Sequence, residues 1–378
     1  MTVPWRKAVR DVGREGMRSV LVVAAMALGI AGFTALLATD AILTRELDRG
    51  YLETNPASAT LFTDAVDEGL LREIRSGHGV SDAEGRRVVS ARIRVGTEWR
   101  ALRLFVVADY GKIRIGRLVP EKGAWPPGRG EMLIERDAFQ VAKARIGDTV
   151  TVRTPRGVER TLRVAGGVHD VGQAQARMEN AVYGYITLAT LSELGEESYL
   201  DQIQILAAVD RANEKHVHSV AADVRRLVES RGHPVRRMDV PKPGRHPHAD
   251  IMGMLLLSLA TFGLCVLALS GILVVNLMTA VMGSQVRQIG VMKTIGGSRA
   301  QIIRIYLAEA AVLGAAAIAV ALPAGILGSR ALCRSMAVFL NFDVTSFAVP
   351  LRVYLLVAAV GLLVPILAAA WPVWKGSG

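Results

Sequence analysis

Two histidine pairs are the residues whose types and spacing come closest to a metal or catalytic site. His246 and His248 stand beside Asp250, while His216 and His218 are separated by a single residue. The first pair falls in a proline-rich stretch, and helix positions i and i+2 do not share a face. Because the spacing places no third ligand beside either pair, we interpret both as solvated polar side chains. The sequence therefore predicts no metal site and no bound cofactor.

Two further patterns could suggest an enzyme. His169 and Asp170 follow a predicted strand, but the chain has no GxSxG nucleophile elbow, so we interpret this pair as part of a loop. The chain also has no GxxxxGK[ST] phosphate-binding loop, and its nearest look-alike, GGSR at 296–299, follows a helix rather than a strand. We predict a protein that is not an enzyme, so any ATP that drives it must be hydrolysed by a separate subunit.

The basic segment 279–310 is the strongest candidate site. It lies between two apolar runs, and a basic helical segment in that position should face the cytoplasm. A helical pattern runs up to Ile295, two glycines break it, and Ser298 with Gln301 forms a capping box that starts the next helix. Such an elbow suits docking of a cytoplasmic partner; the alternative is a merely charged loop at the membrane surface. The candidate docking residues are Arg287, Gln288, Ile289, Gly290, Val291, Lys293, Gly296, Gly297, Ser298, Arg299 and Glu309.

Apolar runs position this segment. The chain is 51% hydrophobic, and charge-free runs cover residues 19–39, 251–286, 310–329 and 353–374. Because a span needs about 20 residues, we predict a multi-pass α-helical membrane protein with four spans, the first of them an uncleaved signal anchor. We place the spans at 19–39 and near 251–280, 307–329 and 353–374. Gly29, Gly32 and Gly263 predict close contacts between spans.

Charge sets the predicted orientation. The tail 1–18 and the loop 281–306 are both rich in arginine and lysine, which favours the cytoplasmic side for both. Both termini are then cytoplasmic, and residues 40–250 lie outside the inner or plasma membrane. The net charge of +11 reflects this topology, and no basic patch with interleaved aromatic residues indicates nucleic-acid binding. The cysteines, Cys265 and Cys333, lie in or beside spans, so the exterior domain is not built around disulfides.

The exterior region 40–250 reads as an α+β domain. Strand and helix patterns alternate as β-α-β over 59–110 and again as β-α-β over 198–240, which suggests a ferredoxin-like half. A β-rich insertion, 111–197, splits this half into its two parts. Within the insertion, two alternating runs are joined by Pro-Arg-Gly at 155–157, which is a hairpin signal.

Two stretches resemble a known family. The run IGVMKTIGGSRAQIIRIYLAEA at 289–310 resembles the cytoplasmic loop of FtsX/MacB-type ABC transporter permeases, and its Ile-Gly-Val step, Gly-Gly-Ser turn and Glu309 fall in the family's order. The stretch GEMLIERDAF…VAGGVHD at 130–170 resembles the MacB-type exterior core domain. The resemblance implies that 40–250 is that core domain, that 251–374 is an FtsX-like permease domain, and that its loop 281–306 is gripped by an ATPase.

The resemblance further implies a function and partners. The chain would be a permease subunit that transmits ATP-driven motion of a separate cytoplasmic P-loop ATPase to the exterior domain, for export or for extraction of a substrate from the envelope. A second permease module is expected, as a homodimer or a related half, because the ATPase should be two-fold. Membrane lipid is a further expected partner, as is a periplasmic adaptor. The alternative is an FtsX-like scaffold that regulates an envelope enzyme without transport; a membrane-anchored sensor or enzyme is less favoured because the sequence offers no catalytic constellation.

Overall fold

The computed structural model of the chain describes residues 16–246, 249–284, 290, 291, 294, 296 and 298–376. The chain divides into two compact units, which we describe separately. The helical unit lies within Met1–Glu46, Asp250–Phe339 and Val344–Gly378. The sheet unit comprises Leu47–Ala249 and the short segment Leu340–Asp343.

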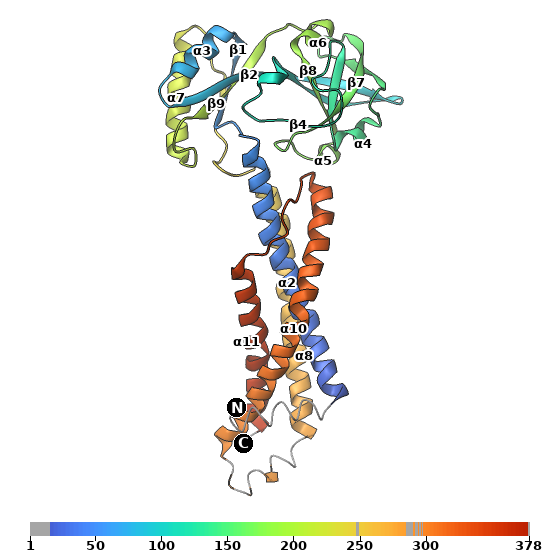
Figure 1. The fold of residues 1–378 in the computed structure, drawn as a ribbon, viewed down its shortest axis with the longest axis vertical. Coiled ribbons are helices and arrows are strands. Elements are labelled where there is room, and N and C mark those ends of the chain that lie inside the picture. Colours follow the sequence, from blue (N-terminus) through green and yellow to red (C-terminus); the bar gives the residue numbers. More distant parts are fainter. Residues whose placement is uncertain are drawn as a thin grey trace. The chain divides into compact units, whose positions relative to one another are not determined.

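Long apolar helices build the helical unit (Figure 1). These helices are α2 (Met17–Glu53), α8 (Ala249–Ser284), α10 (Arg299–Leu340) and α11 (Leu351–Gly376). In the described part of the chain, four helices are long and apolar enough to cross a membrane, which confirms the prediction of four apolar helices. Two of them extend beyond the predicted spans: α2 continues past Thr39, and α10 continues past Ser329. The charge-free runs stop at Asp40 and Arg330, but the residues that follow are mostly compatible with a helix, so the backbone stays helical.

Glycines let these helices approach closely, as the sequence predicted. A Cβ atom added at Gly29 of α2 would lie only 2.3 Å from the Cβ of Ser270 on α8. A Cβ at Gly263 of α8 would lie 2.9 Å from a methyl group of Leu36, and one at Gly325 of α10 would lie 2.6 Å from Thr34. Small residues at such crossings are the usual basis of helix packing in membranes.

Gly29→Leu should therefore destabilise the helical unit. The added side chain has no room beside Ser270, and overpacking of this kind costs about 1–3 kcal/mol. We expect a lower apparent melting temperature of the full chain in mild detergent, followed by loss of the monodisperse species on heating. Gly253→Leu on α8 is the matched control, because nothing lies within 4 Å of its added Cβ atom. Equal melting of the two variants would contradict the close crossing.

The sheet unit is built on one mixed sheet. Its strands are β1 (Ala59–Val66), β2 (Val80–Val95), β3 (Glu98–Val107), β4 (Val119–Gly123), β5 (Glu131–Glu135), β6 (Thr149–Arg153), β7 (Glu159–His169), β8 (Ala181–Thr187), β9 (Leu200–Ala207) and β10 (Arg237–Asp239). Their order is β10-β1-β9-β2-β3-β8-β5-β7-β4, and β6 pairs with β2 and β7. The pairs β3–β8 and β5–β7 are parallel, and the other pairs are antiparallel.

Two amphipathic helices pack on the β1–β9–β2 part of the sheet. The helix α3 (Glu68–Ser76) is capped by Asp67, whose carboxylate accepts from the Leu70 N–H at 2.7 Å. The helix α7 (Glu214–Ser230) contacts α3, β1 and β9, and its apolar positions are buried. A Cβ at Gly85 of β2 would lie 3.5 Å from Leu71 of α3, which identifies the sheet face that the helices cover.

Long strands join the two parts of the sheet. The first residues of β2 pair with β9, whereas Arg92 and Ile93 near its end pair with β6. All of β3 pairs with β2, and most of it also pairs with β8. The predicted ferredoxin-like half and its predicted β-rich insertion therefore share one continuous sheet. Short helices complete this part of the unit, namely η1 (Tyr110–Lys112), α4 (Ala138–Ala142), α5 (Ala176–Glu179) and α6 (Leu188–Glu193).

Candidate coupling site

The structure describes only part of the predicted docking segment. Arg287, Gln288, Ile289, Lys293 and Gly297 lie outside the described residues. Gly290, Val291, Gly296, Ser298 and Glu309 are described, and Arg299 is described by its backbone. The structure therefore describes the candidate site at the elbow before α10 and along α10 itself.

The elbow has the predicted local chemistry. Gly296 adopts a φ of 90°, a conformation that glycine tolerates and other residues rarely adopt. The Ser298 N–H donates to the Gln301 side chain at 2.9 Å, and the Gln301 N–H donates to the Ser298 hydroxyl at 3.3 Å. This reciprocal pair is the predicted capping box, and α10 begins at the next residue, Arg299.

An apolar side chain is exposed just before the elbow. Val291 keeps 55% of its surface exposed, and the Thr294 hydroxyl donates to its carbonyl at 2.8 Å. Gly290 and Gly296 are exposed as well, and a Cβ atom added at either would meet nothing within 4 Å. An exposed apolar residue next to a glycine is open to contact by a partner.

The helix that follows the elbow is long and unbroken. It has 42 residues, which at 1.5 Å per residue is about 63 Å of continuous helix. Glu309 is buried near its start, with 4% of its surface exposed. Further along, a Cβ at Gly314 would lie 3.1 Å from the Gly361 carbonyl of α11, so the two helices pack backbone to backbone. The helix contains Pro323, which has no N–H to donate to the preceding turn.

The far end of α10 leads into a segment that belongs to the sheet unit. The Leu340 carbonyl accepts from the Gln175 side chain at 3.0 Å. The next residue, Asn341, has a φ of 56°, as is common for an asparagine that ends a helix. Residues 340–343, at and just after the end of α10, therefore contact α5 and its neighbours directly.

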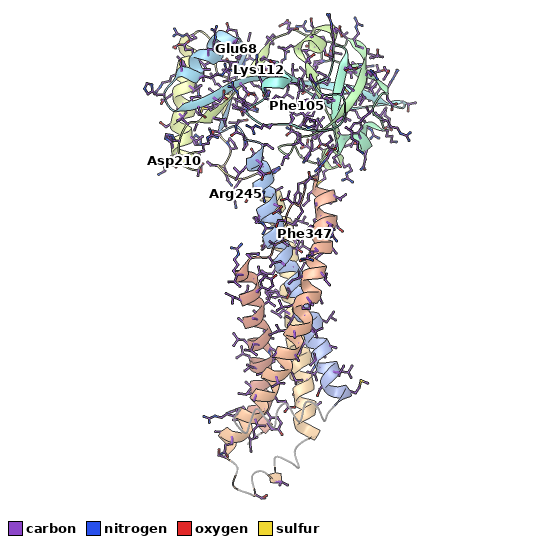
Figure 2. The ribbon with its side chains drawn as sticks, in the orientation of Figure 1. Glu68, Phe105, Lys112, Asp210, Arg245 and Phe347 are labelled. Carbon is purple, nitrogen blue, oxygen red and sulfur yellow. The ribbon has the colours of Figure 1, made fainter. Side chains whose placement is uncertain are left out.

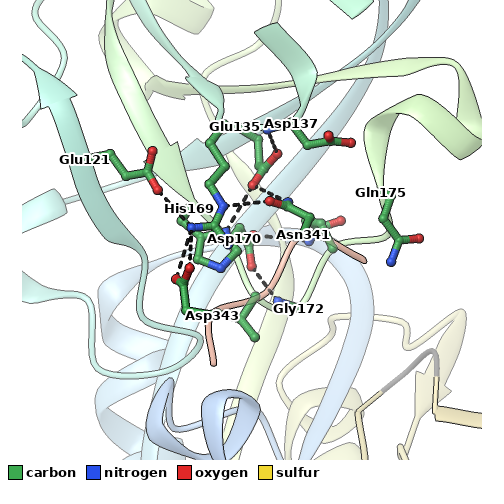
Figure 3. Close-up of polar contacts among 12 residues, drawn as sticks. Glu121, Glu135, Asp137, His169, Asp170, Gly172, Gln175, Asn341 and Asp343 are labelled. Atoms are coloured by element: carbon green, nitrogen blue, oxygen red, sulfur yellow. Dashed lines mark hydrogen bonds and ion pairs between the residues drawn. The ribbon is translucent and has the colours of Figure 1, made fainter. Parts of the chain in front are cut away.

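A partly buried polar cluster holds this segment, with Glu135 and His169 buried and Asp343 exposed (Figure 3). Arg136 donates to the Asn341 side chain at 2.6 Å and to the Asp343 carboxylate at 3.0 Å. The Asn341 amide in turn donates to Glu135 at 2.8 Å. Glu135 is fully buried, with the His169 imidazole 3.2 Å from the same oxygen. Charge-assisted bonds of this kind are the stronger ones, and low exposure protects several of them from water.

His169 and His246 of the sheet unit are buried, so the prediction that His246 is solvated was wrong, and His248 lies outside the described residues. His169 faces Glu135, whereas Asp170 accepts from Tyr185 at 2.8 Å and from the Gly172 N–H at 3.0 Å. Burial raises the pKa of Asp170. The His246 ring lies 2.6 Å from the Val171 carbonyl. Within the described ranges, no three histidine, cysteine or acidic side chains are grouped as metal ligands.

Residues 344–348 are held by the helical unit. Glu46 of α2 is almost fully buried, and it accepts from the Thr345 N–H at 2.8 Å, the Thr345 hydroxyl at 2.7 Å and the Ser346 N–H at 3.0 Å. Arg45 donates to the carbonyls of Ser346 and Ala348. The chain between α10 and α11 is thus fastened on both sides of the Asp343–Val344 bond. Sequence reasoning did not predict these contacts, although an asparagine such as Asn341 after a long helical pattern is a local signal for the end of a helix.

Comparison with known proteins places the elbow, α10 and α11 in one family region. Residues 260–378 match the FtsX-like permease C-terminal family. This FtsX-like region contains all the predicted docking residues and also the fastened segment 340–348. It therefore contains both ends of α10. No curated protein matches the chain in sequence.

Two solved structures resemble the fold at 13% identity. One is the extracellular domain of the noncanonic ABC-type transporter YknZ from Gram-positive bacteria, with a TM-score of 0.34 over 48% of this chain and 100% of that chain. The other is the periplasmic region of MacB from Actinobacillus actinomycetemcomitans, with a TM-score of 0.31 over 47% of this chain and 86% of that chain.

Proposed function

We propose that the chain is the permease subunit of an ABC transporter of the FtsX/MacB class. It transmits the ATP-driven motion of a separate cytoplasmic ATPase to an extracytoplasmic domain, and so exports a substrate or extracts one from the envelope. The sheet unit is that domain, and the order β10-β1-β9-β2 with two helices supports a ferredoxin-like half split by a β-rich insertion. The chain itself performs no catalysis.

One observation carries this proposal. In the FtsX-like region, α10 starts at a capped glycine elbow and ends in a segment fastened to the sheet unit by Arg136 and Glu135. The proposal gives the relay of this motion to α10, because α10 runs from the elbow to Leu340, which belongs to the sheet unit. A partner that moves the elbow can then move the segment 340–343 by the same helix.

The proposal includes topology and partners. Both termini are cytoplasmic in the inner or plasma membrane, the loop 281–306 meets a P-loop ATPase, and lipid surrounds the apolar helices. The ATPase is two-fold, so a second permease module is required, as a homodimer or as a related half. A periplasmic adaptor is a further partner for the sheet unit. An FtsX-like scaffold that regulates an envelope enzyme uses the same relay and remains the second candidate.

Affinity purification tests the proposal. The tagged full chain is isolated in mild detergent with and without trapped ATP, and the co-purified proteins are identified by mass spectrometry. We expect a P-loop ATPase in the eluate, and we expect its loss when Lys293→Glu reverses a charge in the docking loop. An eluate that contains envelope hydrolases and no ATPase would favour the scaffold. An eluate with neither would contradict the permease proposal.

A further inference from the structure

The sheet unit contains a cavity of about 680 Å³ that the coupling site does not use. This volume falls in the range typical of sites for small molecules, roughly 300–1,000 Å³. Its walls come from the residues after α2, from the loop that follows β7, and from the chain around Gly116 and Leu118. Its floor is the sheet itself, where Phe105 (labelled in Figure 2) lies near the C-terminal end of β3.

Strand register explains why these floor residues share one face. Gln204 of β9 pairs with Thr60 of β1, and Arg86 of β2 pairs with both Gln202 and Val107. Directly paired residues point to the same side of a sheet, and so do residues two apart along a strand. The neighbouring positions, such as Gly85, face α3 on the other side. The floor of the cavity therefore lies on the sheet face opposite α3, and His218 of α7 also lines the cavity.

The charged groups of the cavity are already paired. Arg86 donates to Glu84 at 2.7 Å and to the Ile115 carbonyl at 3.1 Å. Arg87 lies over the Tyr199 ring at 4.0 Å and within 3.8 Å of Asp201. Asp170 accepts hydrogen bonds from Tyr185, Gly172 and Gln173. Burial raises the pKa of Asp170, so this carboxyl group is more easily protonated and uncharged. A charged ligand would thus meet no unpaired opposite charge among these groups.

Amide and apolar groups are what the cavity offers instead. The Gln204 side-chain oxygen is buried and has no hydrogen-bond partner within the described residues. Gln202 lies two positions away on the same face of β9. Around them, Val88, Phe105 and Leu118 supply apolar surface. A buried acceptor left unpaired costs about 1–3 kcal/mol. A ligand that donates a hydrogen bond recovers this cost once the half-buried Gln204 side chain turns its amide oxygen toward the cavity.

We propose that this cavity binds an uncharged amphiphile that donates a hydrogen bond to Gln204 and lays its apolar body against Val88 and Phe105. The site goes beyond the proposed transport function, because binding needs neither an ATPase nor a second permease module. It gives the sheet unit its own ligand, held on the sheet face opposite α3.

A pair of fluorescent probes tests the proposal. N-phenyl-1-naphthylamine is uncharged and has one N–H donor, and 8-anilino-1-naphthalenesulfonate has the same rings with an added sulfonate. Each is titrated onto the full chain in nanodiscs, with empty nanodiscs as the lipid background. We expect saturable binding of the uncharged probe above background, and binding of the sulfonate at least about tenfold weaker.

Variants locate the binding. Gln204→Leu removes the acceptor and should weaken the uncharged probe about fivefold to tenfold, while Val88→Phe fills the cavity and should abolish the saturable component. Gln140→Leu is the matched control, since Gln140 is exposed on α4 and does not line the cavity. Gel filtration and circular dichroism establish that each variant is folded. No saturable binding, unchanged or tighter binding in both cavity variants, or equal binding of the two probes would overturn the proposal.

Discussion

Arg136→Ala should release the segment that follows α10. The change removes the donors that hold the Asn341 side chain and the Asp343 carboxylate, while Glu135 keeps its bond to the Asn341 amide. Loss of hydrogen bonds that involve a charged group costs about 2 kcal/mol, so local opening should become about 30-fold more frequent. Hydrogen–deuterium exchange of peptides that cover 340–348 in the full chain measures this directly.

The same variant, Arg136→Ala, should separate ATP hydrolysis from the ATP-dependent motion of the sheet unit. In the proposed function, the ATPase meets the elbow before α10 on the cytoplasmic side, whereas Arg136 belongs to the extracytoplasmic sheet unit. ATPase stimulation by the purified complex should therefore persist. The ATP-dependent change in hydrogen–deuterium exchange within the sheet unit should fall at least about tenfold. The reason is that the segment after α10 is no longer held by the sheet unit and cannot transmit the movement of α10.

A matched arginine gives the control. Arg129 of the sheet unit also forms an ion pair, but it donates to Glu193, and the two side chains are 73% and 38% exposed. Exposed pairs of this type contribute about 0–1 kcal/mol, so Arg129→Ala should leave exchange at 340–348 unchanged. If Arg136→Ala and Arg129→Ala behave alike, the cluster around Glu135 does not fasten the segment and α10 is not the relay.

Local features of this chain could be predicted from its sequence. The apolar helices follow from charge-free runs, the capping box from Ser298 and Gln301 three residues apart, and the helix crossings from Gly29 and Gly263. Each depends on residues close together in the chain, or on a composition that only a membrane helix requires. The ends of helices were less predictable, because a charged residue such as Asp40 ends an apolar run without ending a helix.

The fastening of α10 could not be predicted in the same way. Arg136 and Asp343 are 207 residues apart, and their contact depends on the whole sheet being assembled first. Glu135 looks like one more charged residue at the end of a strand, and only its complete burial beside His169 and Asn341 marks it as structural. The cavity is similar, since its floor is defined by the register of several strands and by no single motif.

Gly296→Pro should uncouple the ATPase from the permease. Proline fixes φ near −65°, whereas Gly296 has a φ of 90°, so the elbow cannot keep its direction. The capping box that starts α10 lies two residues later, so the helix itself should form. We expect a folded permease in which ATPase stimulation falls at least about tenfold, because a misdirected docking segment loses more than about 1.4 kcal/mol of binding.

Gly290→Ala provides the matched control on the other side of the elbow. Gly290 lies in a helical turn, and a Cβ atom added there would meet nothing within 4 Å. Alanine favours a helix over glycine by about 1 kcal/mol, so stimulation should be retained in this variant. The comparison separates the shape of the elbow from the mere presence of a side chain near Val291. Full ATPase stimulation with Gly296→Pro would mean that the ATPase binds elsewhere on the permease. Loss of stimulation with both variants would mean that the docking surface requires glycine at both positions.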